Sequence, residues 1–336
     1  MVMNLATIEK VIAIDPIEGA DRIDVASVLG YKSVVKKGEF KVGDQCVFIK
    51  PDTLVPRKPW NQFLWKDENP AGPPIRLRCA KFRRQVSEGL TLPLIHGLTS
   101  ENIKEGDDVT GLLEIVRYEK PVPAQLRGKI LGNFPFFIPK TDSERLQSNP
   151  KLLEEIRDLK LVTSLKVNGT SATFFIKGGE FGVCSRNLQL KEEEGNAYWD
   201  AAKKYNIEQC LRDTNRDLAI QGEVYGPGIN GNDSGAPTIS LQVFDIWDIE
   251  KRAYLDMEEA FLLCTTWAIP TVKYVTFVHH NTIANFVGFT NTLTYDNGFP
   301  VEGIVCKPQK ERFSEALRGR LQFKVISETH MLKKGE

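Results

Sequence analysis

Short apolar stretches alternate with turn residues through the first third of the chain. The stretches that predict strands cover residues 5–14, 25–29, 33–35 and 46–49. Turn residues separate them, as in the Gly43-Asp44 pair that precedes the last stretch. Many short strands at close spacing are typical of a small β-barrel or sandwich. Residues 51–74 are rich in Pro, Trp and Asn, so we expect a long loop there.

The rest of the chain mixes strand patterns with helix signals. Strands are predicted at 159–165, 173–176, 181–187, 218–226, 241–249, 301–307 and 321–326. Helices are predicted over 195–206 and 257–264, over a short segment that Thr141 or Asp142 caps, and over 151–159 behind Pro150. A chain of 336 residues is longer than one core usually serves. We therefore predict two domains, 1–116 and 117–336, with an extended linker at 119–123.

Composition is that of a globular protein, with 41% hydrophobic and 26% charged residues. No apolar run approaches membrane-spanning length, and the N-terminus lacks the pattern of a signal peptide. The six cysteines include no C-x-x-C pair, which argues against a zinc site or a disulfide framework. The His279-His280 pair is more easily read as incidental than as a metal site. We expect a soluble, intracellular protein, in the cytoplasm or the nucleus.

Positive charge is balanced overall but clustered locally. Lys plus Arg equals Asp plus Glu, at 44 each, so net charge does not indicate nucleic-acid binding. On a strand, the alternation in the densest basic stretch would gather its cations on one face, where they could follow a phosphate backbone while Phe82 stacks on a base. A solvated strand face explains the pattern equally well. The residues of this stretch are Arg76, Arg78, Lys81, Phe82, Arg83 and Arg84.

The turn at 41–44, followed by an apolar strand, is common in small barrels of the OB type. Such barrels often bind nucleic acid. We therefore predict that residues 1–116 form an OB-like β-barrel module.

A lysine ends the first strand predicted in the second domain. Lys166 is followed by Val167-Asn168-Gly169, a polar turn that leads into the next strand. At such a strand end a lysine can be partly shielded from water, which lowers the cost of its neutral, nucleophilic amine. A K-x-x-G tetrapeptide alone is weak evidence, because a surface hairpin lysine gives the same pattern.

Transfer of a nucleotide to a lysine requires several other groups. Cations or a metal must neutralise the phosphate oxygens, a carboxylate must hold the metal, a polar group must fix the ribose, and an aromatic ring must stack on the base. The chain supplies these residue types in order on successive predicted strands: Lys166, Arg186, Glu223, Phe244, Glu302, Lys307 and Lys324.

This order and approximate spacing resemble the motifs of covalent nucleotidyltransferases, and the RNA ligases among them most closely. Residues 139–147 also resemble the segment that precedes the first motif in RNA ligases. The domain order, with an OB-like module N-terminal to the transferase, resembles that of the ATP-dependent RNA ligases that seal nicks with an RNA 3′-OH. Capping enzymes and DNA ligases carry the OB module C-terminal to the transferase. The matching segments are Lys166-Val167-Asn168-Gly169, Ser185-Arg186-Asn187, Gly222-Glu223, Phe244-Asp245, Glu302-Gly303-Ile304-Val305 with Lys307, and Phe323-Lys324.

The resemblance implies an α+β fold, in which an OB-like barrel (1–116) precedes an ATP-grasp-like nucleotidyltransferase domain of antiparallel sheets flanked by helices (117–336). It also implies a covalent lysyl-AMP formed from ATP with Mg²⁺ or Mn²⁺, and RNA or a nicked RNA-containing duplex as substrate, without a membrane or protein partner. The implied roles are attack for Lys166, nucleotide binding for Leu165, Arg186, Glu223 and Phe244, metal binding for Glu302, and contact with the α-phosphate for Lys307 and Lys324.

Two departures from the family pattern stand out. Asn168 replaces the acid of the usual K-x-D-G, although asparagine forms turns as well as aspartate does. One of two lysines common in the last motif is missing, with Gln322 or Ile326 in its place. Three alternatives stay open: a non-catalytic RNA-binding protein with a degenerate transferase domain, a GTP-using capping-type transferase, and a DNA ligase.

Overall fold

The computed structural model describes residues 4–65, 69–83, 85–95, 97–118, 129–275 and 282–334. Arg84, the predicted linker at 119–123 and the His279-His280 pair lie outside these ranges. The chain divides into two compact units. The first comprises Met1–Pro121, Leu146–Pro150 and Glu328–Glu336, and the second comprises Val122–Arg145 and Lys151–Ser327. The predicted boundary between residues 116 and 117 stays a prediction.

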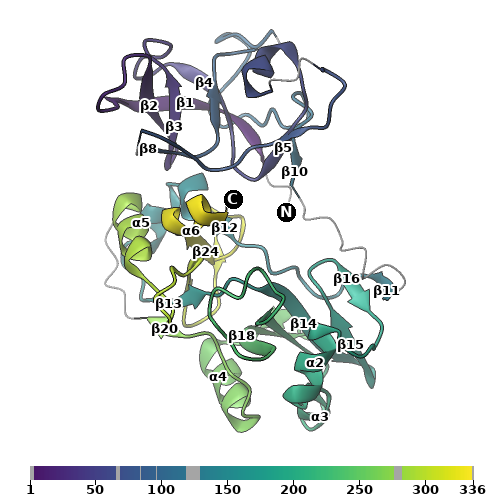
Figure 1. Ribbon diagram of the computed structural model, residues 1–336. Coiled ribbons are helices and arrows are strands. Elements are labelled where there is room, and N and C mark those ends of the chain that lie inside the picture. Colours follow the sequence, from purple (N-terminus) through teal and green to yellow (C-terminus); the bar gives the residue numbers. More distant parts are fainter. Residues whose placement is uncertain are drawn as a thin grey trace. The chain divides into compact units, whose positions relative to one another are not determined.

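The regular secondary structure of the first unit consists mainly of short strands. A five-stranded sheet has the order β3-β2-β1-β4-β9, a three-stranded sheet has the order β10-β5-β6, and β7 pairs with β8 (Figure 1). One helix, α6 (Glu328–Lys334), also belongs to this unit. The strands are β1 (Ala6–Pro16), β2 (Ile23–Val28), β3 (Tyr31–Lys36), β4 (Gln45–Ile49), β5 (Thr53–Val55), β6 (Ile75–Arg76), β7 (Ala80–Phe82), β8 (Gln85–Ser87), β9 (Leu90–Leu92) and β10 (Val116–Arg117).

Strand β4 lies between β1 and β9 in the five-stranded sheet, and apolar residues cover both of its faces. Val47 and Ile49 belong to one buried cluster, whereas Cys46 and Phe48 belong to another. A strand buried on both faces reads in the sequence as a continuous apolar run, and this explains the pattern at 46–49.

The long loop predicted for residues 51–74 is wrong in part. It contains β5 and a 3-10 helix, Pro59–Leu64. The buried side chain of Asn61 fixes this helix, because it accepts a hydrogen bond from the Lys58 N–H at 2.9 Å and donates one to the Pro56 carbonyl at 2.7 Å. Local hydrogen bonds from side chain to backbone can stabilise a short helix in a Pro- and Asn-rich segment, where composition alone predicts a loop.

We predicted that the basic stretch forms one strand with its cations on one face, and this prediction is wrong. Arg76 ends β6, Arg78 lies between strands, and Lys81 and Phe82 belong to the separate β7–β8 hairpin. Arg76 is also committed to neighbours, since its guanidinium lies 2.9 Å from Asp52 Oδ1 and 3.9 Å from the centroid of the Tyr118 ring. Short pairings with different partner strands break the alternation on which the prediction depended.

The second unit contains two large sheets. The first has seven strands in the order β11-β16-β15-β14-β17-β18-β19, and their pairings are antiparallel (Figure 1). One face packs against α2 (Ala197–Lys204), α3 (Ile207–Arg212) and α4 (Met257–Thr266) in a buried apolar cluster. The strands are β11 (Ile130–Asn133), β14 (Thr170–Lys177), β15 (Glu180–Cys184), β16 (Leu188–Leu190), β17 (Leu218–Tyr225), β18 (Ser240–Asp248) and β19 (Ala253–Tyr254).

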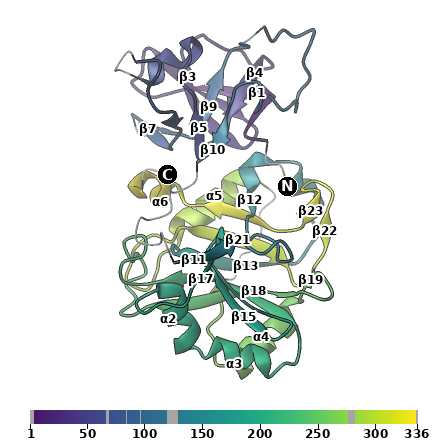
Figure 2. The same cartoon turned by 90° about the vertical axis from the view of Figure 1, so that its right-hand side faces the viewer.

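The second sheet has five strands in the order β12-β24-β21-β13-β20, of which Figure 2 labels β12, β21 and β13. One of its faces is covered by α5 (Ile283–Thr292), where the ring of Phe286 packs edge-on to that of Phe323. The short strands β22 (Phe313–Ser314) and β23 (Gly319–Arg320) form a separate hairpin. The strands of the large sheet are β12 (Glu144–Arg145), β13 (Leu161–Lys166), β20 (Tyr274–Val275), β21 (Gly303–Pro308) and β24 (Phe323–Ile326).

The segment before β13 departs from the prediction. Instead of a short helix capped by Thr141 or Asp142, the chain forms β12 and then a 3-10 turn at Leu146–Ser148. Strand β12 pairs in parallel with β24, which places Arg145 beside Lys324. This long-range pairing overrides the local capping signal. The helix predicted at 151–159 is present but shorter, as α1 (Leu152–Ile156).

None of the helices in the described residues is long and apolar enough to cross a bilayer.

Candidate active site

Lys166 is the last residue of β13, and its amine is ion-paired. It lies opposite Gly303, the first residue of β21. The residue just before β21 is Glu302, and its Oε1 lies 2.7 Å from Lys166 Nζ. The two side chains are only 24% and 13% exposed. This contact favours the charged ammonium, so the amine must lose a proton before it can act as a nucleophile.

Pairing in the five-stranded sheet places three of the predicted lysines on one face. Residues directly opposite each other in antiparallel strands point to the same side, and side chains alternate along each strand. Ser164 faces Val305, which in turn faces Lys324, while Val162 faces Lys307. Lys166, Lys307 and Lys324 therefore share the face that α5 does not cover.

Leu165 points the other way. Its side chain is buried, and its N–H donates to the Lys273 carbonyl at 2.9 Å. Only its backbone can face the side of the sheet that carries the lysines.

The turn after Lys166 lies close to β17. A Cβ on Gly169 would lie 2.8 Å from Glu223 Cγ and closer still to the Val224 carbonyl oxygen, so only glycine fits here. The Gly169 N–H also hydrogen-bonds to the Glu223 carboxylate. This close approach places the end of β13, which carries Lys166, next to β17, which carries Glu223.

Asn168 does more than form a turn. Its buried amide donates to Asp233 Oδ2 at 2.5 Å, and its backbone N–H donates to Tyr295 Oη at 3.0 Å. Asn230 completes the arrangement by donating to Asn168 Oδ1 at 3.2 Å and to the Gly169 carbonyl. An aspartate at position 168 would have no amide to donate. In this chain the carboxylate of the pair is Asp233, and Asn168 supplies the donor.

Glu223 is a half-buried carboxylate with a perturbed acidity. It lies on the face of the seven-stranded sheet opposite the helices, next to Ser171 and Gln242. Burial, with a smaller contribution from the charge of Glu302, raises the pKa of Glu223 to about 7, against the opposing influence of Lys166 and Arg186. A carboxyl that titrates near neutrality among charged groups is a frequent mark of a functional site.

Arg186 follows β15 and is tied to the segment that precedes the lysine strand. Its guanidinium lies 2.8 Å from Asp142 Oδ1, and both side chains are largely exposed. One residue earlier, Thr141 Oγ1 lies 2.9 Å from Ser171 Oγ. Residues 139–142 therefore cross the polar face of the seven-stranded sheet beside Glu223.

Lys307 belongs to a second charged cluster. Its amine donates to Asp245 Oδ1 at 2.6 Å and to the Phe244 carbonyl at 2.8 Å. Arg320 binds both oxygens of Asp245, at 2.7 and 2.6 Å, pairs with Glu311, and stacks 3.8 Å from the Tyr254 ring centroid. Burial alone would raise the pKa of Asp245, but Lys307 and Arg320 lower it to about 2. In this structure the Lys307 amine is held by Asp245.

Phe244 occupies a β-bulge in β18. Gln221 pairs with Asp245 and Gly222 pairs with Val243, so Phe244 has no partner opposite it on β17. A bulge redirects one side chain out of the regular alternation, and bulges are common next to active sites. The period-two pattern at 241–249 predicts the strand but not this irregularity.

The structure thus brings Lys166, Arg186, Glu223 and Glu302 together, with Lys307 and Phe244 in a second cluster and Lys324 on the lysine face. The basic residues predicted to bind nucleic acid belong to the first unit, where Arg78, Lys81, Phe82 and Arg83 are exposed.

Sequence analysis missed several partners of these residues. Asp233 stands in a Gly- and Asn-rich loop whose composition predicts only a turn. Asp142 and Asp245 lie within segments that the motifs cover, and adjacency to a motif could have drawn attention to them. Nothing in the local sequence singles out Arg320 or Tyr295.

The carboxylates at Lys166 fit a divalent cation of the magnesium or manganese type. Glu302 is close enough to Glu223 for its charge to act on that carboxyl, and carboxylate oxygens are the ligands that such cations prefer. The described residues contain no group of three or more His, Cys, Asp or Glu side chains placed to hold a metal. These two carboxylates therefore suit a cation that keeps water or substrate oxygens as its other ligands.

Comparisons with known proteins agree with this architecture. A family model described as RNA ligase matches residues 159–326, and one described as an OB-fold domain matches residues 5–94. No protein in the curated set that was searched matches the chain.

Solved structures of a Naegleria gruberi RNA ligase match nearly the whole chain at 34% identity. A mutant form with AMP and Mn covers 98% of this chain and 98% of that chain, with a TM-score of 0.87. A mutant form with ATP and Mn covers 97% and 98%, with a TM-score of 0.86, and a form with pyrophosphate covers 98% and 98%, with a TM-score of 0.85. The predicted fold class, an OB fold ahead of antiparallel sheets with flanking helices, is confirmed.

Proposed function

The chain belongs to the RNA ligase family and is an ATP-dependent ligase, and we propose that it joins RNA ends through a lysyl-AMP formed on Lys166. The observation that carries this proposal is the position of one amine. Lys166 ends a strand, lies 2.7 Å from Glu302, and adjoins Glu223, whose carboxyl titrates near neutrality.

In the first step the neutral amine of Lys166 attacks the α-phosphorus of ATP. A P–N bond forms, the bond to the β-phosphate oxygen breaks, and pyrophosphate leaves. Separation of the amine from Glu302 favours loss of its proton, because the ion pair stabilises the ammonium. The complexes of the Naegleria enzyme with ATP, AMP and pyrophosphate support this chemistry.

The other residues grip the nucleotide. Arg186 and Glu223 hold the ribose, and Phe244, freed from strand alternation by its bulge, stacks on adenine. Lys324 and Lys307 contact the α-phosphate and stabilise its developing charge. Lys307 reaches the phosphate only after its amine leaves Asp245, so its contact depends on that exchange. Leu165 contributes through its backbone.

Glu302 would hold Mg²⁺ or Mn²⁺, while Glu223 beside it holds the ribose. When bound, such a cation neutralises charge on phosphate oxygens. Manganese in complexes of the Naegleria enzyme supports this assignment.

Two further steps complete the reaction. A 5′-phosphate oxygen of RNA attacks the lysyl-AMP phosphorus, which breaks the P–N bond, returns the lysine amine, and leaves AMP on the RNA end. The 3′-OH of the other end then attacks the activated 5′-phosphate, and AMP departs. We propose a nick in duplex with RNA on the 3′-OH side as substrate. Residues 1–116 would be the OB-like module and 117–336 the adenylyltransferase domain.

The exposed cations Arg78, Lys81 and Arg83, with Phe82, are our candidates in the OB-like module for contact with the RNA backbone and a base. Arg76 is a weaker candidate, because Asp52 and Tyr118 hold its guanidinium. Six free, buried cysteines are consistent with an intracellular location.

The decisive test is covalent trapping. The protein is incubated with α-labelled ATP and Mg²⁺ or Mn²⁺, denatured, and examined for label on protein. We expect label on the wild type and on a Lys160→Ala control, an exposed lysine just before β13, and none on Lys166→Ala. Label that survives in Lys166→Ala would contradict the assignment.

Two assays separate the remaining alternatives. Unlabelled GTP in excess should fail to compete with ATP, whereas effective competition would favour a capping-type transferase. Matched nicks that differ only in RNA or DNA on the 3′-OH side then distinguish an RNA ligase from a DNA ligase. A wild-type protein that binds RNA but never takes label would be a non-catalytic RNA-binding protein.

A further inference from the structure

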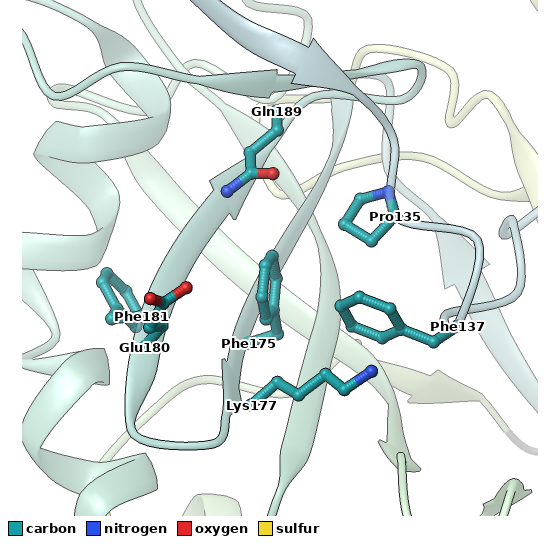
Figure 3. Close-up of a pocket in the computed structure, with 7 residues that line it drawn as sticks. All are labelled: Pro135, Phe137, Phe175, Lys177, Glu180, Phe181 and Gln189. Carbon is teal, nitrogen blue, oxygen red and sulfur yellow. The ribbon is translucent and has the colours of Figure 1, made fainter.

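A pocket of about 250 Å³ opens in the second unit, and none of the residues assigned to the nucleotide lines it. It lies at the β14–β15 hairpin, where residues 134–138 pack against the seven-stranded sheet. Its lining consists of Pro135, Phe137, Phe175, Lys177, Glu180, Phe181 and Gln189 (Figure 3).

The aromatic walls of the pocket are fixed by their neighbours. The buried ring of Phe175 meets that of Phe137 edge-to-face, with centroids 5.6 Å apart. Gly182 lies opposite Phe175 on β15, and a Cβ there would overlap the Phe175 ring. Trp247 Nε1 donates to the Phe137 carbonyl at 3.1 Å. A ligand therefore meets a wall that is already ordered.

The polar groups of the pocket are available to a ligand. Within the described residues, neither the Glu180 carboxylate nor the Gln189 amide makes a hydrogen bond or an ion pair. Lys177 Nζ lies 3.8 Å from the Phe137 ring centroid and is exposed. Figure 3 shows the Gln189 amide and the Lys177 amine on opposite sides of the Phe175 ring. The pocket thus offers one amide, one carboxylate and one ammonium around aromatic rings.

The chain connects this pocket to the nucleotide site. Ser171, which contacts Thr141 beside Glu223, and Phe175 share one face of β14, four residues and about 13 Å apart. Residues 139–142 follow part of this path. Thr141 lies at Ser171, and the Pro139 carbonyl accepts a hydrogen bond at 2.8 Å from Nε2 of Gln221, which pairs with Thr173 midway along β14. Lys140, whose amine donates to Asn187 Oδ1, adds an exposed cation along the way.

We propose that this pocket binds an unpaired nucleobase of the RNA substrate, close to the end that reacts at Lys166. The inference rests on the proposed function. Bases stack on aromatic side chains, an amide and a carboxylate can hydrogen-bond to a base edge, and Lys177 and Lys140 can contact phosphates of the same strand. A volume below the ~300–1,000 Å³ of pockets for drug-sized ligands suits a single planar base.

The base must be unpaired, because a base within a duplex is stacked on its neighbours and its pairing edge is occupied. Taking it out costs a few kcal/mol, and least where the strand is already single. At a nick, the pocket therefore favours a strand end that is frayed, so that one base can leave the duplex.

The test uses the full-length protein and short 5′-phosphorylated, single-stranded oligoribonucleotides that carry 2-aminopurine at one position each. We expect wild-type protein to change the fluorescence strongly at one position. Phe137→Ala should abolish that change and weaken binding by about 5- to 150-fold, the equivalent of ~1–3 kcal/mol of stacking. Self-adenylylation should stay unchanged, because Phe137 lies outside the nucleotide site.

Phe136→Ala is the matched control, since this ring packs edge-on against Phe137 with centroids 5.7 Å apart but is 97% exposed and does not line the pocket. Gln189→Ala keeps the aromatic walls and should also weaken binding, which preserves the test if Phe137→Ala lowers the melting temperature. Wild-type affinity and fluorescence in both pocket variants, or an equal loss in Phe136→Ala, would overturn the inference. Wild-type protein that takes no label from ATP would instead overturn the proposed function.

Discussion

A buried and a half-buried carboxylate in the same unit have pKa values shifted in opposite directions. Asp245 is bound by Lys307 and by both arms of Arg320, and its pKa falls to about 2. Glu223 also has a lysine and an arginine nearby, Lys166 and Arg186, but burial, together with the charge of Glu302, raises its pKa to about 7. Burial penalises both charges, so the result depends on whether the cations donate hydrogen bonds to the carboxylate and on whether a second carboxylate lies beside it.

This difference separates two clusters: a fixed cluster of Asp245, Lys307 and Arg320, and an adjustable cluster of Lys166, Glu223 and Glu302, in which the charges can change. Asp245 stays ionised at any pH at which the protein is handled, and it links β18 to β21 and β23. The cluster around Lys166 contains two carboxylates and a lysine whose charges shift when a phosphate or a cation arrives. We propose that the Asp245 cluster holds the site together and that the chemistry takes place at the Glu223 cluster.

The largest expected effect comes from Asp245→Asn. It leaves Lys307 and Arg320 without their shared partner, and breaking a buried ion pair costs about 3–5 kcal/mol. Chemical denaturation should show this loss in the free energy of unfolding. Glu208→Gln, which breaks an exposed pair with Arg212, is the control and should cost less than about 0.5 kcal/mol. Equal losses in the two variants would remove the distinction.

The pH dependence of stability should separate the two carboxylates next. Folded Glu223 keeps its proton up to about pH 7, whereas the unfolded chain releases it near the ordinary value of 4.5. The folded state therefore binds more protons between these values, so this residue makes stability fall as pH rises, by an amount on the order of 3 kcal/mol.

Denaturation of wild type and Glu223→Gln from about pH 5 to about pH 8 measures this contribution, which the variant should lack. The stabilising contribution of Asp245 is lost only as pH falls below 3.8 toward about 2, so it stays constant over the measured range. Parallel curves for the two proteins would show that Glu223 does not titrate there.

Asn168→Asp, which restores the usual K-x-D-G, should be harmful in this chain. It places a second carboxylate against Asp233, where the amide now donates at 2.5 Å, and the lost bond should cost ~2 kcal/mol. Thermal melts and label transfer from ATP would measure the damage. The exchange of both residues, Asn168→Asp with Asp233→Asn, should restore much of the loss, because a donor again faces an acceptor. Failure of that rescue would show that the pair is not the cause.

The smallest effect on stability is expected for the exposed pair of Arg186 and Asp142, which lies beside Glu223. Asp142→Ala breaks the Arg186–Asp142 pair, whose side chains are 46% and 36% exposed, and should change the free energy of unfolding by less than about 1 kcal/mol. It should still alter the KM for ATP in self-adenylylation, because Arg186 loses the partner that orients it. An unchanged KM would show that Asp142 does not position Arg186.

Several features followed from short-range patterns alone. The apolar runs around Lys166, Glu223 and Lys307 predicted β13, β17 and β21, and the order of charged residues on those strands gave the resemblance to RNA ligases. Other features could not be predicted, because the local composition indicates a different structure. The cap signal at Thr141 predicts a helix, but the chain forms β12 there. The basic stretch predicts one strand, but its residues divide between two sheets.

By itself, the sequence determined which residue types stand at strand ends and in what order, because alternation and turn chemistry act over a few neighbouring residues. The tertiary structure alone decided the charge state of each group. Asn168 meets Asp233 from 65 residues away, and Arg320 meets Asp245 from 75. Acidity depends on burial and on charges within a few ångströms, and only the folded chain brings those groups together.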